Sequence, residues 1–142
     1  MESRNAHLYL NKLGGRCVQY KTDYYHLDSG LHRGMPQDRF LLEMDIEDAR
    51  TRDRESASLR DALDRFPTAS RECMPEADAL LVEIVGDVRR VQAEDQDQAL
   101  AWRMNTRPIF LEYINNRGMV ADQLFSDTLD GKRRSFYLLR KP

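Results

Sequence analysis

The stretch from Pro75 to Met104 constrains the fold most, because apolar residues recur along its first half at steps of three and four. This spacing places the apolar side chains along one face of a helix. They are Ala77, Leu80, Leu81, Ile84, Val85, Val88 and Val91. Pro75 suits the first turn of such a helix, since an N–H at that position would have no partner in the helix. The pattern therefore predicts a scaffold helix that begins at Pro75.

The second half of this stretch leaves two interpretations open. Residues 92–98 are polar around the whole circumference of a helix, whereas an apolar character returns from Ala99 onward. Neither proline nor glycine interrupts this part, so one helix of about 30 residues, roughly 45 Å long, is allowed. In the other interpretation, the helix breaks near Glu94–Gln98.

Charge is segregated along the chain, although the formal net charge is only −2. Residues 45–99 carry eight basic and fifteen acidic side chains, whereas residues 100–142 carry eight basic and four acidic ones. Segregated charge indicates interaction surfaces. The leading hypothesis is therefore a small soluble, non-catalytic regulatory or inhibitory protein. It would bind another macromolecule, most simply a protein, through an acidic helical surface that includes Glu94, Asp95 and Asp97. The long helix is also a candidate for homo-oligomerisation.

Length and composition predict a single domain over residues 1–142. The longest apolar runs have four residues, whereas a membrane-spanning helix needs about 20. The first ten residues have no apolar signal-peptide core. Cys17 and Cys73 lie far apart, which favours two reduced thiols and leaves one disulfide as the alternative. These features predict a cytoplasmic protein that neither contacts a membrane nor carries a cofactor. We find no internal repeat.

The N-terminal third has strand character. Residues 17–27 are rich in Tyr, Val and Thr and predict one or two strands, and residues 39–46 alternate between apolar and polar side chains. A helix is predicted from about Glu47 to Phe66, where Pro67 ends it. Another is predicted after Asn105, with Pro108 in its first turn and Gly118 as its stop.

The last 24 residues also have two interpretations. In the first, Asp130-Gly131 is a two-residue hairpin turn, which places Phe125 opposite Phe136 and Asp127 opposite Arg134. In the second, residues 121–129 and 132–141 are two helices. The run IFLEYINNRGMVADQLFSDTLDGKRRSFYLLRK then resembles the helix-turn-helix of bacterial transcription regulators, which implies a basic recognition helix at its end. The hairpin is favoured, because Asp-Gly is a typical hairpin turn and Lys132 replaces the usual small capping residue.

Either interpretation allows the basic end to bind nucleic acid. Basic side chains interleaved with aromatic rings contact phosphates while a ring stacks on a base. The candidate residues within 107–141 are Lys132, Arg133, Arg134 and Arg140. The alternative is an ordinary solvated surface that balances the acidic middle of the chain.

The third hypothesis is a small metal-dependent hydrolase or transferase. His26 and Asp28 would share one face of a strand, and His32 follows within a loop length. Two imidazoles and a carboxylate can bind a divalent metal, or act as a base and its orienting acid. Because His-x-Asp is a low-information pattern, ordinary surface residues are the simpler explanation, and we assign no metal.

Together these patterns predict an α+β fold. A small antiparallel sheet of N-terminal strands, extended by the C-terminal hairpin if it forms, would pack on about three helices, one of them long.

Overall fold

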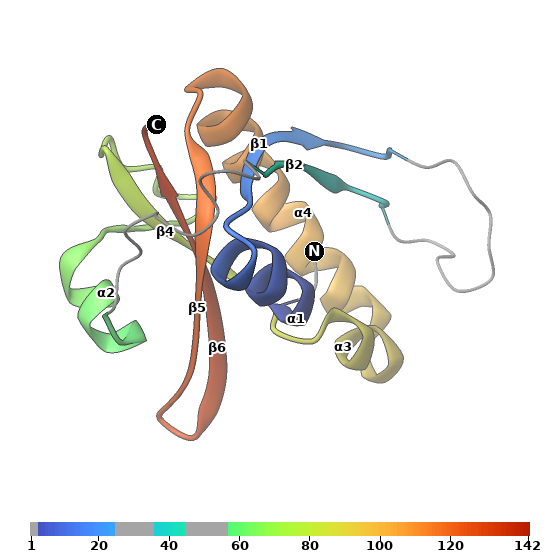
Figure 1. The fold of residues 1–142 in the computed structure, drawn as a ribbon. Helices are drawn as coiled ribbons and strands as arrows, with labels where there is room; N and C mark the ends of the chain where they lie inside the picture. Colours follow the sequence, from blue (N-terminus) through green and yellow to red (C-terminus); the bar gives the residue numbers. More distant parts are fainter. Residues whose placement is uncertain (1–2, 25–35, 45–56) are drawn as a thin grey trace.

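The computed structural model describes residues 3–24, 36–44 and 57–142, which form a curved six-stranded sheet between helices (Figure 1). The elements in chain order are α1 (Ser3–Ala6), η1 (His7–Lys12), β1 (Arg16–Lys21), β2 (Arg39–Glu43), α2 (Leu59–Arg65), β3 (Thr68–Ala69), β4 (Ala79–Ile84), α3 (Val88–Glu94), α4 (Gln96–Phe110), η2 (Leu111–Asn116), β5 (Val120–Leu129) and β6 (Lys132–Arg140). The strand order is β2-β1-β5-β6-β4-β3, with β3 parallel to β4 and the other pairs antiparallel.

The prediction of a small antiparallel sheet on about three helices is wrong. The sheet is large and mixed, and four α-helices occur in the described part of the chain, one of them long. The main error is the helix predicted from Pro75, because residues 79–84 form strand β4 between β3 and β6. Both faces of β4 are covered, so residues 79–82 form a continuous apolar run instead of alternating with polar residues. Such a run cannot be distinguished from a buried helix by spacing alone.

Of the two interpretations of residues 92–104, the break near Glu94–Gln98 is confirmed and the single continuous helix is wrong. Helix α3 ends at Glu94, and Asp95 is extended, with φ −154° and ψ 99°. The Asp95 carboxylate accepts a hydrogen bond from the backbone N–H of Gln98 at 3.0 Å and so caps α4. The predicted boundary at Asn105 is wrong, because α4 continues to Phe110 with Pro108 inside it.

Other expected elements are confirmed within the described residues. The second half of the helix predicted over 47–66 is α2, which is capped by Ser58 and followed by Pro67. The predicted N-terminal strands correspond to β1 and β2. The expected parts of these elements within 25–35 and 45–56 lie outside the described residues.

The C-terminal hairpin is confirmed, with Phe125 opposite Phe136 and Asp127 opposite Arg134. The interpretation as two helices is therefore wrong. Strand β6 lies between β5 and β4 and has five consecutive buried residues, 135–139. The apolar pair Leu138-Leu139 thus contributes one side chain to each face of the sheet, as a strand buried on both faces requires.

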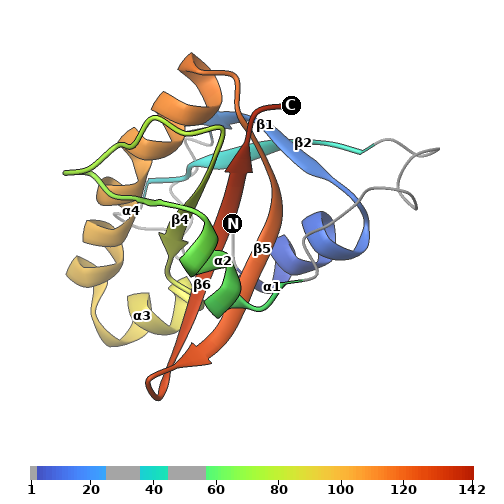
Figure 2. The same ribbon diagram turned by 90° about the vertical axis from the view of Figure 1, so that its left-hand side faces the viewer.

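The two faces of the sheet support separate cores, as Figure 2 allows the reader to follow. On one face, Tyr137 and Leu139 pack with apolar residues of η1, α4 and η2. On the other face, Phe136 and Leu138 pack with α2. The face covered by α4 carries the aromatic residues that form the site described below.

An internal repeat, which the sequence did not disclose, relates residues 7–20 to residues 111–124 at a constant offset of 104 positions. Four of the fourteen pairs are identical: Tyr9/Tyr113, Asn11/Asn115, Gly14/Gly118 and Gln19/Gln123. In each copy a π-helical turn is followed, two residues after its end, by a glycine with positive φ, 74° at Gly14 and 67° at Gly118, and then by a strand. Each strand also has a register shift at the equivalent place, between residues 17 and 19 and between residues 121 and 123. Because the equivalent residues Cys17 and Ala121 pair with each other, a local twofold axis passes between them.

The two repeats hold each other through an exchanged pair of asparagines. Asn11 donates to the Leu124 carbonyl at 2.7 Å and accepts from the Leu124 N–H at 2.8 Å. Asn115 makes the equivalent bonds to Tyr20, at 2.8 Å and 2.9 Å. Each side-chain amide thus satisfies one backbone donor and one acceptor of the other repeat.

Candidate ligand-binding pocket

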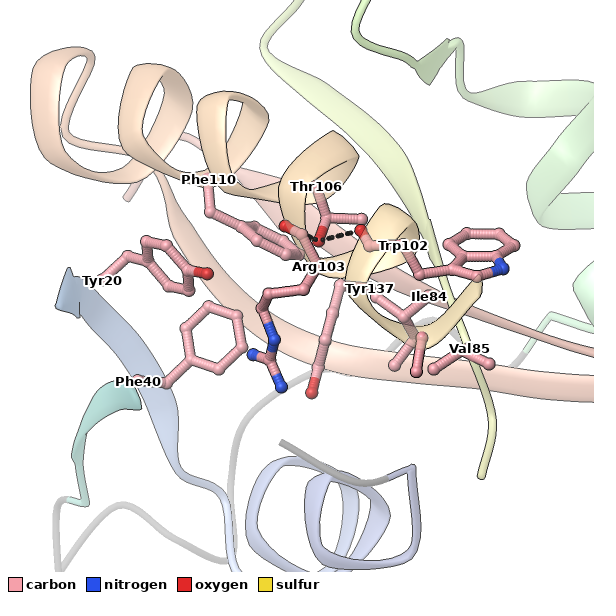
Figure 3. Close-up of a pocket in the computed structure, with 10 residues that line it drawn as sticks. Tyr20, Phe40, Ile84, Val85, Trp102, Arg103, Thr106, Phe110 and Tyr137 are labelled. Carbon is pink, nitrogen blue, oxygen red and sulfur yellow. Dashed lines mark hydrogen bonds between the residues drawn. The ribbon is translucent and has the colours of Figure 1, made fainter. Parts of the chain in front are cut away.

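Five aromatic side chains surround a cavity of about 40 Å³ between α4 and the sheet (Figure 3). They are Tyr20 of β1, Phe40 of β2, Trp102 and Phe110 of α4, and Tyr137 of β6. The rings of Phe40 and Phe110 lie 5.0 Å apart between centroids, and those of Phe40 and Tyr137 lie 5.3 Å apart. Phe40 and Tyr137 pair with the equivalent residues Tyr20 and Leu124, so they are themselves equivalent and meet at the local twofold axis.

Phe40 and Tyr137, which occupy equivalent positions, differ by one group, the hydroxyl of Tyr137. Tyr137 is 1% exposed, and its hydroxyl has no hydrogen-bond partner among the residues that the structure describes. Burial raises the pKa of Tyr137 well above its usual range, so this hydroxyl stays protonated and remains a donor. A buried polar group without a partner costs about 1–3 kcal/mol. An unpaired donor of this kind indicates a site for a water molecule or a ligand.

Arg103 brings a positive charge to the same place. Its side chain extends from α4 into the pocket beside Phe40 and Tyr137, and its guanidinium lies toward the end of the pocket where Figure 3 shows the Tyr137 hydroxyl. Its charge acts on both Tyr20 and Tyr137, lowering the pKa of each against the stronger effect of burial. No carboxylate of the described residues forms an ion pair with Arg103.

A buried ion pair fixes this end of α4 against the sheet. Arg107, one turn after Arg103, donates to the two carboxylate oxygens of Asp38 at 2.7 Å and 3.1 Å. The Tyr20 hydroxyl donates to Asp38 at 2.5 Å, and the backbone N–H of Asp23 donates at 3.0 Å. Burial alone would raise the pKa of Asp38, but the hydrogen bonds from Arg107 and Tyr20 outweigh it and hold the pKa below its usual range. The ionised Asp38 therefore fixes the direction of the Tyr20 hydroxyl and the position of α4.

The predicted acidic site residues lie at the junction of α3 and α4 and are exposed. Asp95 has a local role as the cap of α4, and Asp97 lies in the first turn of that helix, where negative charge is favourable. The Glu94 carboxylate oxygen Oε1 lies 3.9 Å from Nε of Arg90 on the same helix. Capping and helix electrostatics therefore account for Asp95 and Asp97, and the predicted partner remains untested.

The predicted basic site residues divide into two pairs. Arg134 forms two hydrogen bonds of 2.7 Å with Glu83 on the neighbouring strand, and Arg140 bonds Asp122 at 3.0 Å. Lys132 and Arg133 are exposed beside the hairpin turn, where Arg133 bonds Ser126 at 3.3 Å. The first pair thus neutralises acidic side chains of the sheet itself, which leaves two of the four charges facing solvent.

The three remaining candidates, His26, Asp28 and His32, lie outside the described residues. Within the residues that are described, no group of three side chains is arranged to hold a metal ion. The helices of this same part are all too short or too polar to cross a membrane.

The pocket residues were not identified from the sequence. The apolar neighbours Ala99 and Leu100 favour a place in the core for Trp102, yet it is only half-buried and lines the pocket. Arg103 and Tyr137 lie 34 positions apart and meet only because β6 crosses beneath α4. The one available signal was an arginine beside the single tryptophan of the chain, which is a pattern of little specificity. Comparisons with protein-family models, with curated proteins and with solved structures find no match to this chain.

Proposed function

We propose that this protein is a non-catalytic binding domain that takes the anionic group of a small molecule into the aromatic pocket. The observation that carries the proposal is the buried, unpartnered Tyr137 hydroxyl close to the Arg103 guanidinium. Both groups are hydrogen-bond donors, and a ligand with acceptor oxygens would satisfy them together. The aromatic walls would exclude water and so strengthen the attraction between Arg103 and an anion.

Binding is favoured over catalysis by the kinds of group that face the pocket. Burial raises the pKa of Tyr20 and of Tyr137, so neither hydroxyl is a base near neutral pH. The Thr106 hydroxyl donates to the carbonyl of Trp102 at 3.0 Å. The described lining residues therefore supply donors and apolar surface, and they include no carboxylate or imidazole that would act as a general base.

Trp102 provides the test, because it is the only tryptophan of the chain and lines the pocket. Its fluorescence is titrated with small organic and inorganic anions. We expect a saturable change with at least one of them, which Arg103→Met removes and the control Arg133→Met, on the exposed hairpin, retains. Absence of a saturable response to every anion would contradict the proposal, and so would an equal response in Arg103→Met.

A second candidate is binding of a macromolecule through the acidic junction of α3 and α4. It is supported by the exposure of Glu94 and Asp97 immediately before the helix that forms the pocket. The test is affinity capture with the native chain and with a Glu94→Lys, Asp97→Lys variant. A partner retained equally by both chains would exclude this surface.

A further inference from the structure

We infer that the anionic group is a carboxylate and not a phosphate or sulfonate, an inference that rests on the proposed function. The number of donors is the first reason. The Tyr20 hydroxyl is committed to Asp38 at 2.5 Å, and the Thr106 hydroxyl to a backbone carbonyl. Among the described lining residues this leaves the Tyr137 O–H and the Arg103 N–H groups that do not bond the Tyr20 hydroxyl, since Figure 3 shows the indole N–H of Trp102 at the opposite end of the pocket. These donors match two oxygens in one plane, which is the geometry of a carboxylate.

A group with three terminal oxygens fits this set of donors poorly. Its third oxygen would face the rings of Phe40 and Phe110, which offer no donor. An acceptor left unpaired in such surroundings weakens binding, because it loses its water without gaining a partner. The same reasoning explains why sites built around polar groups discriminate strongly among their ligands.

The charge of the site is the second reason. Arg103 is the one cationic side chain among the described lining residues of the pocket. The nearby Arg107 is already paired with Asp38 at 2.7 Å and with Asp23 at 3.2 Å, so its charge is not available to a ligand. A single negative charge is thus matched, whereas the second charge of a phosphate dianion would be buried without a partner.

The size and walls of the pocket are the third reason. A cavity of about 40 Å³ has room for a compact head group, and its walls are flat aromatic rings. The rings of Phe40 and Tyr137 contact each other edge to face, with centroids 5.3 Å apart, so a planar carboxylate would lie against this pair of rings beside the Arg103 fork and the Tyr137 hydroxyl. An aromatic or aliphatic body attached to the carboxylate would then contact Trp102 and Phe110, so we expect apolar carboxylic acids to bind more tightly than acetate.

The test uses ligands with one body and different head groups. Benzoate, benzamide, benzenesulfonate and phenylphosphonate are titrated at pH 8 against the full chain, with Trp102 fluorescence and calorimetry as readouts. We expect benzoate to bind at least tenfold more tightly than each of the others. Arg103→Lys, which keeps the charge but loses the fork of donors, is expected to lose most of this preference. N-acetylphenylalanine, added as a further arm, distinguishes a peptide carboxylate from a free small acid, since its bulkier α-carbon must also fit the pocket.

The outcomes separate the two proposals. If phenylphosphonate or benzenesulfonate binds as tightly as benzoate, and Arg103→Met abolishes that binding, the proposed function stands and the carboxylate inference is overturned. If none of the four compounds binds, both are overturned, and the Tyr137 hydroxyl is left with an ordered water as its partner.

Discussion

Replacing Tyr137 by phenylalanine is expected to stabilise the protein and to abolish ligand binding. The ring contacts with Phe40 and Phe110, at 5.3 Å and 5.9 Å between centroids, are retained by phenylalanine. The substitution removes only a hydroxyl that is buried and unpaired. The penalty for such a group is about 1–3 kcal/mol, and a small cavity left by the oxygen offsets part of the gain. We therefore expect the free energy of unfolding to rise by about 1–2 kcal/mol, which raises Tm by roughly 3–8 °C.

The measurement is urea and thermal unfolding of the two chains without ligand, followed by titration with benzoate. The matched control is Tyr20→Phe, because the Tyr20 hydroxyl is buried in the same pocket but donates to Asp38 at 2.5 Å. That control is expected to lose about 1–3 kcal/mol, since a buried carboxylate is deprived of a donor. If Tyr137→Phe is instead destabilised as much as Tyr20→Phe, the Tyr137 hydroxyl has a bound partner in the free protein, and the reasoning is refuted.

Three further perturbations test the framework of the site. Asp38→Asn leaves Arg107 facing a neutral side chain, so we expect the free energy of unfolding, measured by chemical denaturation, to fall by roughly 2–4 kcal/mol. This loss is smaller than for a fully buried ion pair, because Arg107 keeps its contact with Asp23. Asn11→Ala and Asn115→Ala each remove the two hydrogen bonds of one asparagine to the backbone of the other repeat, so the free energy of unfolding should fall by amounts that agree within about 1 kcal/mol. A large difference between the two losses would contradict the equivalence of the repeats. Burial raises the pKa values of Tyr20 and Tyr137 in the folded protein. Above pH about 10 these two hydroxyls therefore lose their protons in the unfolded chain but keep them in the folded chain. The contribution of the two tyrosines to the free energy of unfolding is therefore complete below pH about 10 and should decrease as the pH rises further. Thermal unfolding between about pH 8 and pH 11 measures this decrease.

Local signals predicted those elements whose structure is decided locally. Asp130-Gly131 identified the hairpin and its register because the geometry of a two-residue turn fixes which residues oppose each other. The polar run around Asp95 indicated a break there as one of two interpretations, and the break occurs between α3 and α4 because no core holds that segment in one helix. Strand β4 was missed because its apolar run is compatible with a helix until its neighbours, β6 and β3, are known.

The candidate site could not be predicted in the same way, because it depends on contacts between distant parts of the chain. Arg103 and Tyr137 appear in the sequence as an ordinary helix residue and an ordinary strand residue. Their meeting is determined by the curvature of the sheet and by the ion pair of Asp38 with Arg107, whose partners are separated by 69 positions. The repeat is weak in the sequence for a related reason, because only four of its fourteen pairs are identical and the side-chain hydrogen bonds between the repeats come from Asn11 and Asn115.

The exchanged asparagines imply that the contact between the two repeats has the form of a subunit interface within one chain. In a twofold homodimer each subunit contributes the same group to the other, and Asn11 and Asn115 do so here across the pair of Cys17 and Ala121. Two separate polypeptides, each carrying one repeat, should consequently bind each other. Each would offer an unpaired strand edge and an asparagine side chain that bonds the backbone of the other strand. Because both repeats belong to one chain, the two residues at the axis need not be identical, and Phe40 and Tyr137 differ there by a single hydroxyl.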